Sequence, residues 1–216
     1  MITYLLSNPP DLPVFLVGIL AAVVAITVHE FAHAKVASWL GDPTGRLAGR
    51  LSLNPRRHLD PMGSFVVLVA GFGWGKPVPV AKNKLGSKGR RIVVALAGPG
   101  ANAGLAVLAA LAIGAIGAGL RILGLLVGFL IALVQVNLLN AVFNLLPIPP
   151  LDGFPILEEL LPQRRSEIIY FLEKWGFLIL LAAAFVLFRP VLGPILAALA
   201  EVLARLAGAV PGRLVV

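Results

Sequence analysis

Cysteine is absent from this chain of 216 residues, and charged residues make up only 13% of it. Without cysteine the chain forms no disulfides, and it has no thiolate to bind a metal ion or attack a substrate. With 59% apolar residues, the composition excludes an ordinary soluble domain and indicates an integral membrane protein with several helical spans. The net charge of +8 is explained by lysine and arginine in cytoplasmic loops, so we expect no nucleic-acid partner.

Long apolar runs predict an all-α polytopic membrane protein with about five full transmembrane helices. A membrane helix needs about 20 mostly apolar residues, and the first such run extends from Val14 to about Leu40. The other four predicted spans are Ile92 to about Gly119, Ile122 to about Leu146, Ile168–Phe188 and Val191 to about Gly208.

A shorter apolar segment, Met62–Gly75, follows the first span and is only 14 residues long. Both of its flanks are basic, with four arginines over residues 46–57 and six lysines or arginines over residues 76–91. A crossing would place one basic flank outside, against the usual distribution of charge. We therefore predict that Pro61–Ala81 is a re-entrant element, and its Pro77–Val80 end is expected to be extended. A short conventional sixth helix is the alternative.

The first span contains His29, Glu30 and His33 in an H-E-x-x-H pattern. A spacing of four places both histidines on one face of a helix. In this pattern two imidazoles bind one zinc ion, and the glutamate acts as a general base. Such groups are costly in a membrane helix unless they face a partner or a cavity, which favours a functional site. The alternative is a chance match whose histidines are ordinary core residues, although the chain has only three histidines in all.

A third zinc ligand is predicted from the depth at which polar residues lie in the membrane. The first and third spans are expected to end on the cytoplasmic side, so Asp152, which follows Pro147–Pro150, lies near the histidines. Catalytic zinc sites use three protein ligands and one open position, and this carboxylate completes the set. The remaining histidine, His58, lies in a basic segment where we expect solvent or lipid headgroups. Asp42 and Asp60 are expected to be turn or capping residues.

Asparagines mark the second and third spans. Asn137, Asn140 and Asn144 lie at spacings of three and four, and so form one polar stripe on the third span. The stripe is explained either by hydrogen bonds between helices or by a polar path that brings water to the zinc ion. Asn102 either bonds across helices or satisfies the backbone that Pro99 frees, and the sequence favours the second explanation.

Two motifs together resemble the site-2 protease family of intramembrane zinc metalloproteases, in its short prokaryotic branch without PDZ or CBS domains. One motif is the H-E-x-x-H sequence inside a membrane span. The other runs from Asn144 to Gly153 and is similar to the family's N-x-x-P-x-P-x-L-D-G. Weaker similarity extends over Gly49–Pro55, Asp60–Gly63 and Ala97–Pro99 with Asn102.

The resemblance implies that His29, His33 and Asp152 bind one zinc ion, that Glu30 is the general base, and that Asn144 positions or polarises the scissile carbonyl. It implies a zinc metalloendopeptidase that cleaves membrane proteins within or near their transmembrane helices, with membrane lipid as its other partner. We expect one protease domain over residues 1–216, with a catalytic core of about 14–153 and C-terminal helices over about 168–208. The active site is expected to face the cytoplasmic side of the cell membrane.

Two alternatives follow from the same residues. A zinc-binding membrane protein without catalysis, or a zinc transporter, would also place ligands in the membrane, but a transporter would need ligands on several spans and an exit route. Another kind of membrane peptidase combines H-E-x-x-H with a glutamate as third ligand. In that case Glu158 or Glu159 would replace Asp152, although Leu151-Asp152-Gly153 fits the pattern better.

Overall fold

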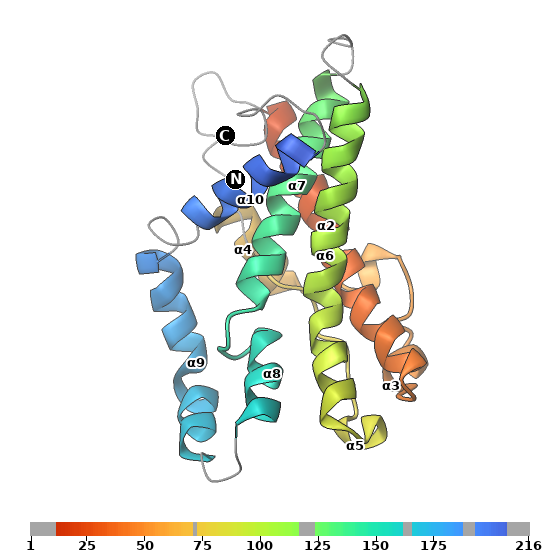
Figure 1. The fold of residues 1–216 in the computed structure, drawn as a ribbon, viewed down its shortest axis with the longest axis vertical. Helices are drawn as coiled ribbons and strands as arrows, with labels where there is room; N and C mark the ends of the chain where they lie inside the picture. The colour runs from red at the N-terminus through yellow and green to blue at the C-terminus, as the bar shows by residue number, and fades with distance from the viewer. Residues whose placement is uncertain (1–11, 71–72, 117–123, 162–165, 188–192, 207–216) are drawn as a thin grey trace.

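The computed structural model describes residues 12–70, 73–116, 124–161, 166–187 and 193–206. Most of these residues are helical, and within them the β pairing is limited to one isolated bridge. The three longest elements are α2 (Leu12–Trp39), α6 (Lys88–Ile116) and α7 (Gly124–Asn144), which run side by side (Figure 1). The others are α3 (Thr44–Leu47), η1 (Pro55–Arg57), α4 (Pro61–Ala70), α5 (Lys82–Leu85), α8 (Gly153–Leu160), α9 (Ser166–Leu187) and α10 (Gly193–Leu206).

Three of the described helices are long and apolar enough to cross a membrane. They are α2, α6 and α7, with 28, 29 and 21 residues, and they correspond to the first three predicted full spans. The fourth predicted span, Ile168–Phe188, falls on α9. The described part of the fifth, Val191 to about Gly208, is the 14-residue helix α10, which extends about 21 Å against a hydrocarbon core of about 30 Å. The count of five spans therefore stays a prediction.

The core between α2, α6 and α7 is built largely from alanine. Ala21 on α2 and Ala106, Ala109 and Ala110 on α6 are buried in one cluster, together with Val134 of α7. In a membrane, helices associate through close packing rather than through the hydrophobic effect, and small side chains allow their backbones to approach. The alanine-rich sequence thus explains how three apolar helices form a compact bundle.

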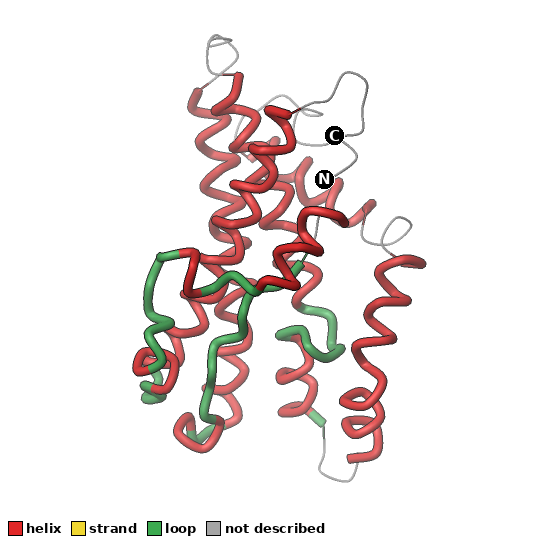
Figure 2. The backbone as a smooth tube through the Cα atoms, turned by 180° about the vertical axis from the view of Figure 1, so that it is seen from behind, coloured by secondary structure: helices red, strands yellow, loops and turns green. Residues whose placement is uncertain are grey.

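The segment Pro61–Ala81 forms a hairpin. Its first half is α4, a helix of ten residues, which is too short to cross a membrane. Its second half, from Gly73 to Ala81, contains no helix and runs as a loop beside the bundle (Figure 2). An antiparallel bridge joins Leu59, which precedes α4, to Gly75, so the chain returns after α4 to the place where the helix begins. That this segment re-enters a membrane stays a prediction.

Asp42 fixes the chain where α2 ends. Gly41 adopts a φ of 104°, a left-handed conformation typical of the residue that terminates a helix. The buried Asp42 carboxylate then accepts hydrogen bonds from the Thr44 amide at 3.0 Å and from the Ala81 amide at 2.6 Å. Burial raises the pKa of Asp42, but a hydrogen bond from the Thr44 hydroxyl and these two bonds from amides outweigh it and hold the pKa below its ordinary value. The turn predicted at Asp42 is confirmed, as is the capping role of Asp60, which accepts from the Gly63 amide.

His58 contradicts the expectation that it contacts solvent or lipid headgroups. Its side chain is fully buried, and Nε2 donates a hydrogen bond to the Ser52 carbonyl at 2.6 Å. Burial lowers the pKa of the imidazole, and the nearby arginines Arg50 and Arg57 lower it further. His58 is therefore a neutral core residue that holds the loop before the hairpin. The prediction failed because it relied on the charges of neighbours in sequence, which do not report where a side chain points.

Candidate metal centre

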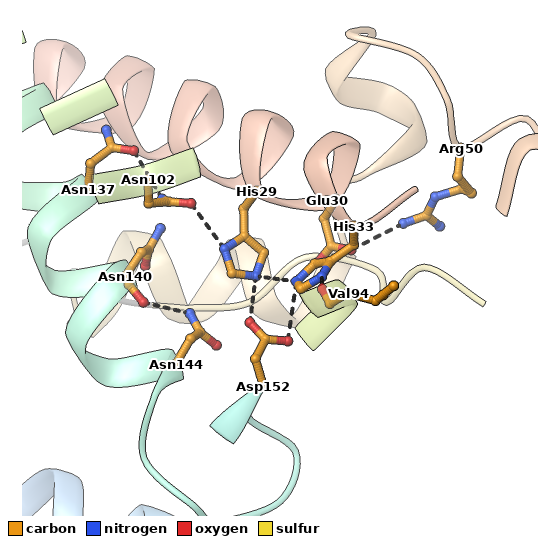
Figure 3. Close-up of polar contacts among 10 residues, drawn as sticks. All are labelled: His29, Glu30, His33, Arg50, Val94, Asn102, Asn137, Asn140, Asn144 and Asp152. Carbon is orange, nitrogen blue, oxygen red and sulfur yellow. Dashed lines mark hydrogen bonds and ion pairs between the residues drawn. The ribbon is translucent and has the colours of Figure 1, made fainter. Parts of the chain in front are cut away.

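Two histidines from α2 and one aspartate from the turn before α8 converge on one point (Figure 3). His29 Nε2 lies 3.0 Å from Asp152 Oδ2, and His33 Nε2 lies 3.2 Å from Asp152 Oδ1. The two Nε2 atoms are 3.1 Å apart. One ligand atom from each of the three residues lies within 4.8 Å of the other two, so one ion can contact all three residues.

The opposite side of each imidazole is held by an acceptor. His33 Nδ1 lies 2.8 Å from the Val94 carbonyl, and His29 Nδ1 lies 3.0 Å from Asn102 Oδ1. Because a carbonyl oxygen only accepts hydrogen bonds, the proton of each neutral ring is on Nδ1. Each Nε2 therefore presents a lone pair to the centre of the site, which is the arrangement that metal-binding histidines use.

These donor atoms fit a zinc ion. Two imidazole lone pairs and two carboxylate oxygens face one another, and four acceptors repel unless a cation lies among them. Within the described residues, the buried Oδ2 of Asp152 has no hydrogen-bond donor. Imidazole and carboxylate are ligands that zinc prefers, and three protein ligands leave one position open for chemistry.

Gly98 on α6 gives the imidazoles their space. A methyl group at this position would lie 2.6 Å from His29 Nε2, closer than non-bonded atoms approach. The glycine thus allows α6 to pack directly against the histidine face of α2. It is buried, as are both histidines.

Glu30 lies beside the histidines on α2 and is 8% exposed. Its Oε2 is 3.8 Å from Nη2 of Arg50, whose side chain is also buried. The same guanidinium donates to the Lys76 carbonyl on the hairpin. The hairpin comes close on the other side as well, because a methyl group on Gly75 would lie 2.9 Å from Glu30 Oε1. Glu30 is thus enclosed by Arg50 and the hairpin.

A cavity of about 860 Å³ opens onto the site. Glu30, His33 and Asp152 line it, as do Asn140 and Asn144 of α7. Its other walls are mostly apolar and come from the hairpin, α6, α8 and α9. A cavity of this size admits water and an apolar peptide segment. The two asparagines supply polar groups along it, in agreement with the predicted polar path.

Comparison with known proteins gives consistent matches. The profile of peptidase family M50 matches residues 113–187, which include Asn144 and Asp152. The protein YwhC of Bacillus subtilis is 40% identical over 170 residues, covering 76% of this chain and 77% of YwhC. The chain belongs to peptidase family M50, the site-2 protease family.

Other relatives match the chain over a smaller share of their own length. Rip2 of Mycolicibacterium smegmatis is 32% identical over 182 residues, covering 77% of this chain and 65% of Rip2. Rip2 of Mycobacterium tuberculosis is 36% identical over 160 residues, covering 71% of this chain and 60% of Rip2. YwhC and Rip2 each carry the name "putative zinc metalloprotease". No solved structure matches the chain.

The residues predicted from the M50 motifs lie together around this cavity. Asn144 is one of them, and its Nδ2 donates to the Asn140 carbonyl at 2.9 Å. The two glutamates considered as alternative ligands are engaged elsewhere, since Glu158 pairs with Lys82 and Glu159 pairs with Arg91. The roles of the site residues stay predictions, and the geometry favours Asp152 over either glutamate as the third ligand.

The sequence assigns no partner to two buried residues near the candidate metal centre. It places Arg50 only among the arginines of a cytoplasmic loop. For Asn102 it leaves two roles open, a hydrogen bond across helices or satisfaction of the backbone that Pro99 frees, and it favours the second. The structure places Arg50 against Glu30 and Asn102 against His29. The segments that contain Arg50 and Asn102 both resemble the family, and this resemblance could have indicated a role at the site. It does not identify which residue either side chain contacts.

Proposed function

We propose that the protein is an intramembrane zinc metalloprotease that hydrolyses peptide bonds within or near transmembrane helices of membrane-protein substrates. The observation that carries this proposal is the convergence of His29, His33 and Asp152 on one point beside Glu30, inside a bundle of three helices of membrane-spanning length. Membership of peptidase family M50 and the names of its relatives support a zinc metalloprotease.

In this proposal His29, His33 and Asp152 bind one zinc ion per chain. Bound zinc supplies Lewis acidity, which polarises a peptide carbonyl and makes water more acidic. Glu30 accepts a proton from the attacking water and delivers it to the leaving amine as the C–N bond breaks. Asn144 donates one Nδ2 hydrogen to the Asn140 carbonyl, and its second hydrogen is available for the substrate carbonyl oxygen.

The mostly apolar cavity supports a transmembrane helix as substrate. The backbone of such a helix is internally hydrogen-bonded, so it must unwind locally before its carbonyl becomes available. We propose that the protein is a multi-pass component of the cell membrane and that its site faces the cytoplasm. The segments at residues 46–57 and 76–91 carry ten lysines or arginines, and they include the end of α3 and all of α5, which lie at the same end of the bundle (Figure 1).

Cleavage by the purified protein in lipid vesicles tests the proposal. A panel of single-span membrane proteins is presented to the wild type and to Glu30→Gln, and products are identified by mass spectrometry. We expect cuts within or near the spans that require Glu30 and disappear with a zinc chelator, while Glu30→Gln still binds one zinc ion. Retained turnover in Glu30→Gln would contradict the assigned base. Bound zinc without cleavage of any panel member would favour a non-catalytic zinc-binding protein or a transporter.

A further inference from the structure

A chain of hydrogen bonds connects His29 to the backbone of α7 (Figure 3). His29 Nδ1 lies 3.0 Å from Asn102 Oδ1 on α6. Asn102 Nδ2 donates to Asn137 Oδ1 on α7 at 3.0 Å, and Asn137 Nδ2 donates to the Leu133 carbonyl at 2.8 Å. Both asparagine side chains are completely buried. The three helices that form the bundle are therefore joined by one polar chain inside an apolar core.

These hydrogen bonds can run in only one direction, from His29 to Asn102 and from Asn102 to Asn137, because the last of them ends on a backbone carbonyl. The Leu133 carbonyl only accepts hydrogen bonds, so the group that Asn137 turns toward it is the amide nitrogen. Asn137 must then present its oxygen to Asn102, which in turn donates from its own nitrogen and presents its oxygen to His29. The proton of His29 is thereby required on Nδ1, and the lone pair of Nε2 is left for the metal.

We infer that Asn102 and Asn137 are positioning residues that set the tautomer of His29 and so present its Nε2 to the metal. The inference rests on the proposed role of His29 as a zinc ligand. Neither asparagine touches the substrate or the metal in this assignment. Asn102 acts on His29 directly, and Asn137 acts by fixing the orientation of the Asn102 amide.

The comparison with His33 explains why two asparagines are needed. His33 Nδ1 faces the Val94 carbonyl, a backbone group that cannot rotate to present a donor. His29 faces a side-chain amide, which could rotate to present its nitrogen instead of its oxygen. Such a rotation of Asn102 would bring its oxygen against the oxygen of Asn137, leaving two buried acceptors in contact. Asn137 therefore prevents the rotation.

The test measures the tautomer in the metal-free protein and zinc affinity by competition with a chelator. The chain has three histidines, so the imidazole ¹⁵N signals of the labelled protein are few enough to assign by single replacements. His58 is an internal reference, because its Nε2 donates to Ser52 and its tautomer is the opposite one. In the wild type we expect His29 to be protonated on Nδ1.

Three variants and one control separate positioning from packing. Asn102→Leu removes the acceptor, and we expect about 10-fold to 100-fold weaker zinc binding, with a mixture of His29 tautomers. Asn137→Leu should give the same mixture with a smaller loss of affinity. Asn102→Asp keeps an acceptor for His29, so its zinc affinity should remain within a few-fold of the wild type. Asn83→Leu, which alters an exposed amide on α5 far from these hydrogen bonds in sequence, should leave both measurements unchanged.

Equal losses of zinc affinity in Asn102→Asp and Asn102→Leu would overturn the inference. Only the leucine variant removes the acceptor for His29, so equal losses would come from changes that both variants share, in the packing and in the bond to Asn137. An unchanged His29 tautomer in Asn102→Leu or in Asn137→Leu would also overturn it for that residue. The tautomer is measured without metal and without substrate. A wild type that binds zinc but cleaves nothing therefore contradicts the proposed function, while these measurements still decide the positioning role.

Discussion

Asp152 Oδ1 lies 3.2 Å from His33 Nε2, although the two residues are held by different parts of the fold. His33 is fixed within α2, whereas Asp152 directly precedes α8. Helix α8 packs against α6, and two ionic contacts from Glu159 to Arg91, at 2.5 and 2.8 Å, join the two helices. The position of the proposed third ligand therefore depends on how α8 docks.

Asp152→Ala is expected to weaken zinc binding by at least about 100-fold and to abolish cleavage, because two ligands do not complete a catalytic zinc site. Zinc affinity is measured by competition with a chelator. Glu158→Gln is the matched control, since it removes a nearby carboxylate that pairs with Lys82 instead of facing the histidines. Loss of zinc in the control, with retention in Asp152→Ala, would assign the third ligand to the glutamate.

Reversing the charges of the Arg91–Glu159 pair tests whether the docking of α8 matters for zinc. The contact is bidentate, and such pairs are specific in geometry as well as in charge. Either Arg91→Glu or Glu159→Arg alone places like charges together, and we expect zinc binding to weaken by about tenfold or more. The double reversal should recover most of the affinity. A double variant as weak as the single ones would show that the two residues act independently.

Gly98→Ala is expected to disrupt zinc binding because the added methyl group would lie 2.6 Å from His29 Nε2. Gly104→Ala is the matched control on α6, since a methyl group there meets no atom within 4 Å. We expect the control to keep its zinc affinity and to gain up to about 1 kcal/mol of helix stability. Equal zinc affinity in the two variants would show that α6 can move away from the histidines at little cost.

Arg50→Gln should reduce the turnover number by up to about 100-fold while zinc occupancy stays near one per chain. The guanidinium lies 3.8 Å from Glu30 Oε2 and also binds the hairpin, so its loss lets the proposed base move. Arg57→Gln is the control from the same loop, and its guanidinium binds the Gly49 carbonyl. An unchanged turnover number in Arg50→Gln would limit this arginine to a structural role.

The lowered pKa of the Asp42 carboxyl predicts that the folded protein loses stability in acid. Its pKa is lower in the folded protein than in the unfolded chain, so its contribution is complete above an ordinary pKa of about 3.8 and is lost as the pH falls through the lowered value. Asp42→Asn leaves the partly buried Ala81 amide facing a donor and should cost about 1–3 kcal/mol at pH 7. The unfolding temperatures of metal-free wild type and variant should converge below about pH 3.8. A difference that does not change with pH would contradict the role of the ionised carboxylate.

The sequence predicted the three long spans, because length and hydropathy are properties of a local stretch of chain. It also predicted a re-entrant element over Pro61–Ala81 from its short apolar run and its two basic flanks. The structure brings Gly75 back beside Leu59, and the re-entrant course in a membrane stays a prediction. The surroundings of single polar residues were harder to predict from the sequence. His58 and Arg50 share a basic loop in sequence, yet both side chains turn inward.

By itself the sequence determined which residues are candidates for zinc-dependent peptide hydrolysis, since the spacing of His29 and His33 places them on one helix face and the motif around Asp152 accompanies it. Only the tertiary structure decided what surrounds these groups. Asn102, Asn137 and Arg50 acquire their partners from helices and loops distant in sequence. The physical reason is that a buried polar group must find a hydrogen-bonding partner wherever packing brings one, and helix packing is a property of the whole bundle.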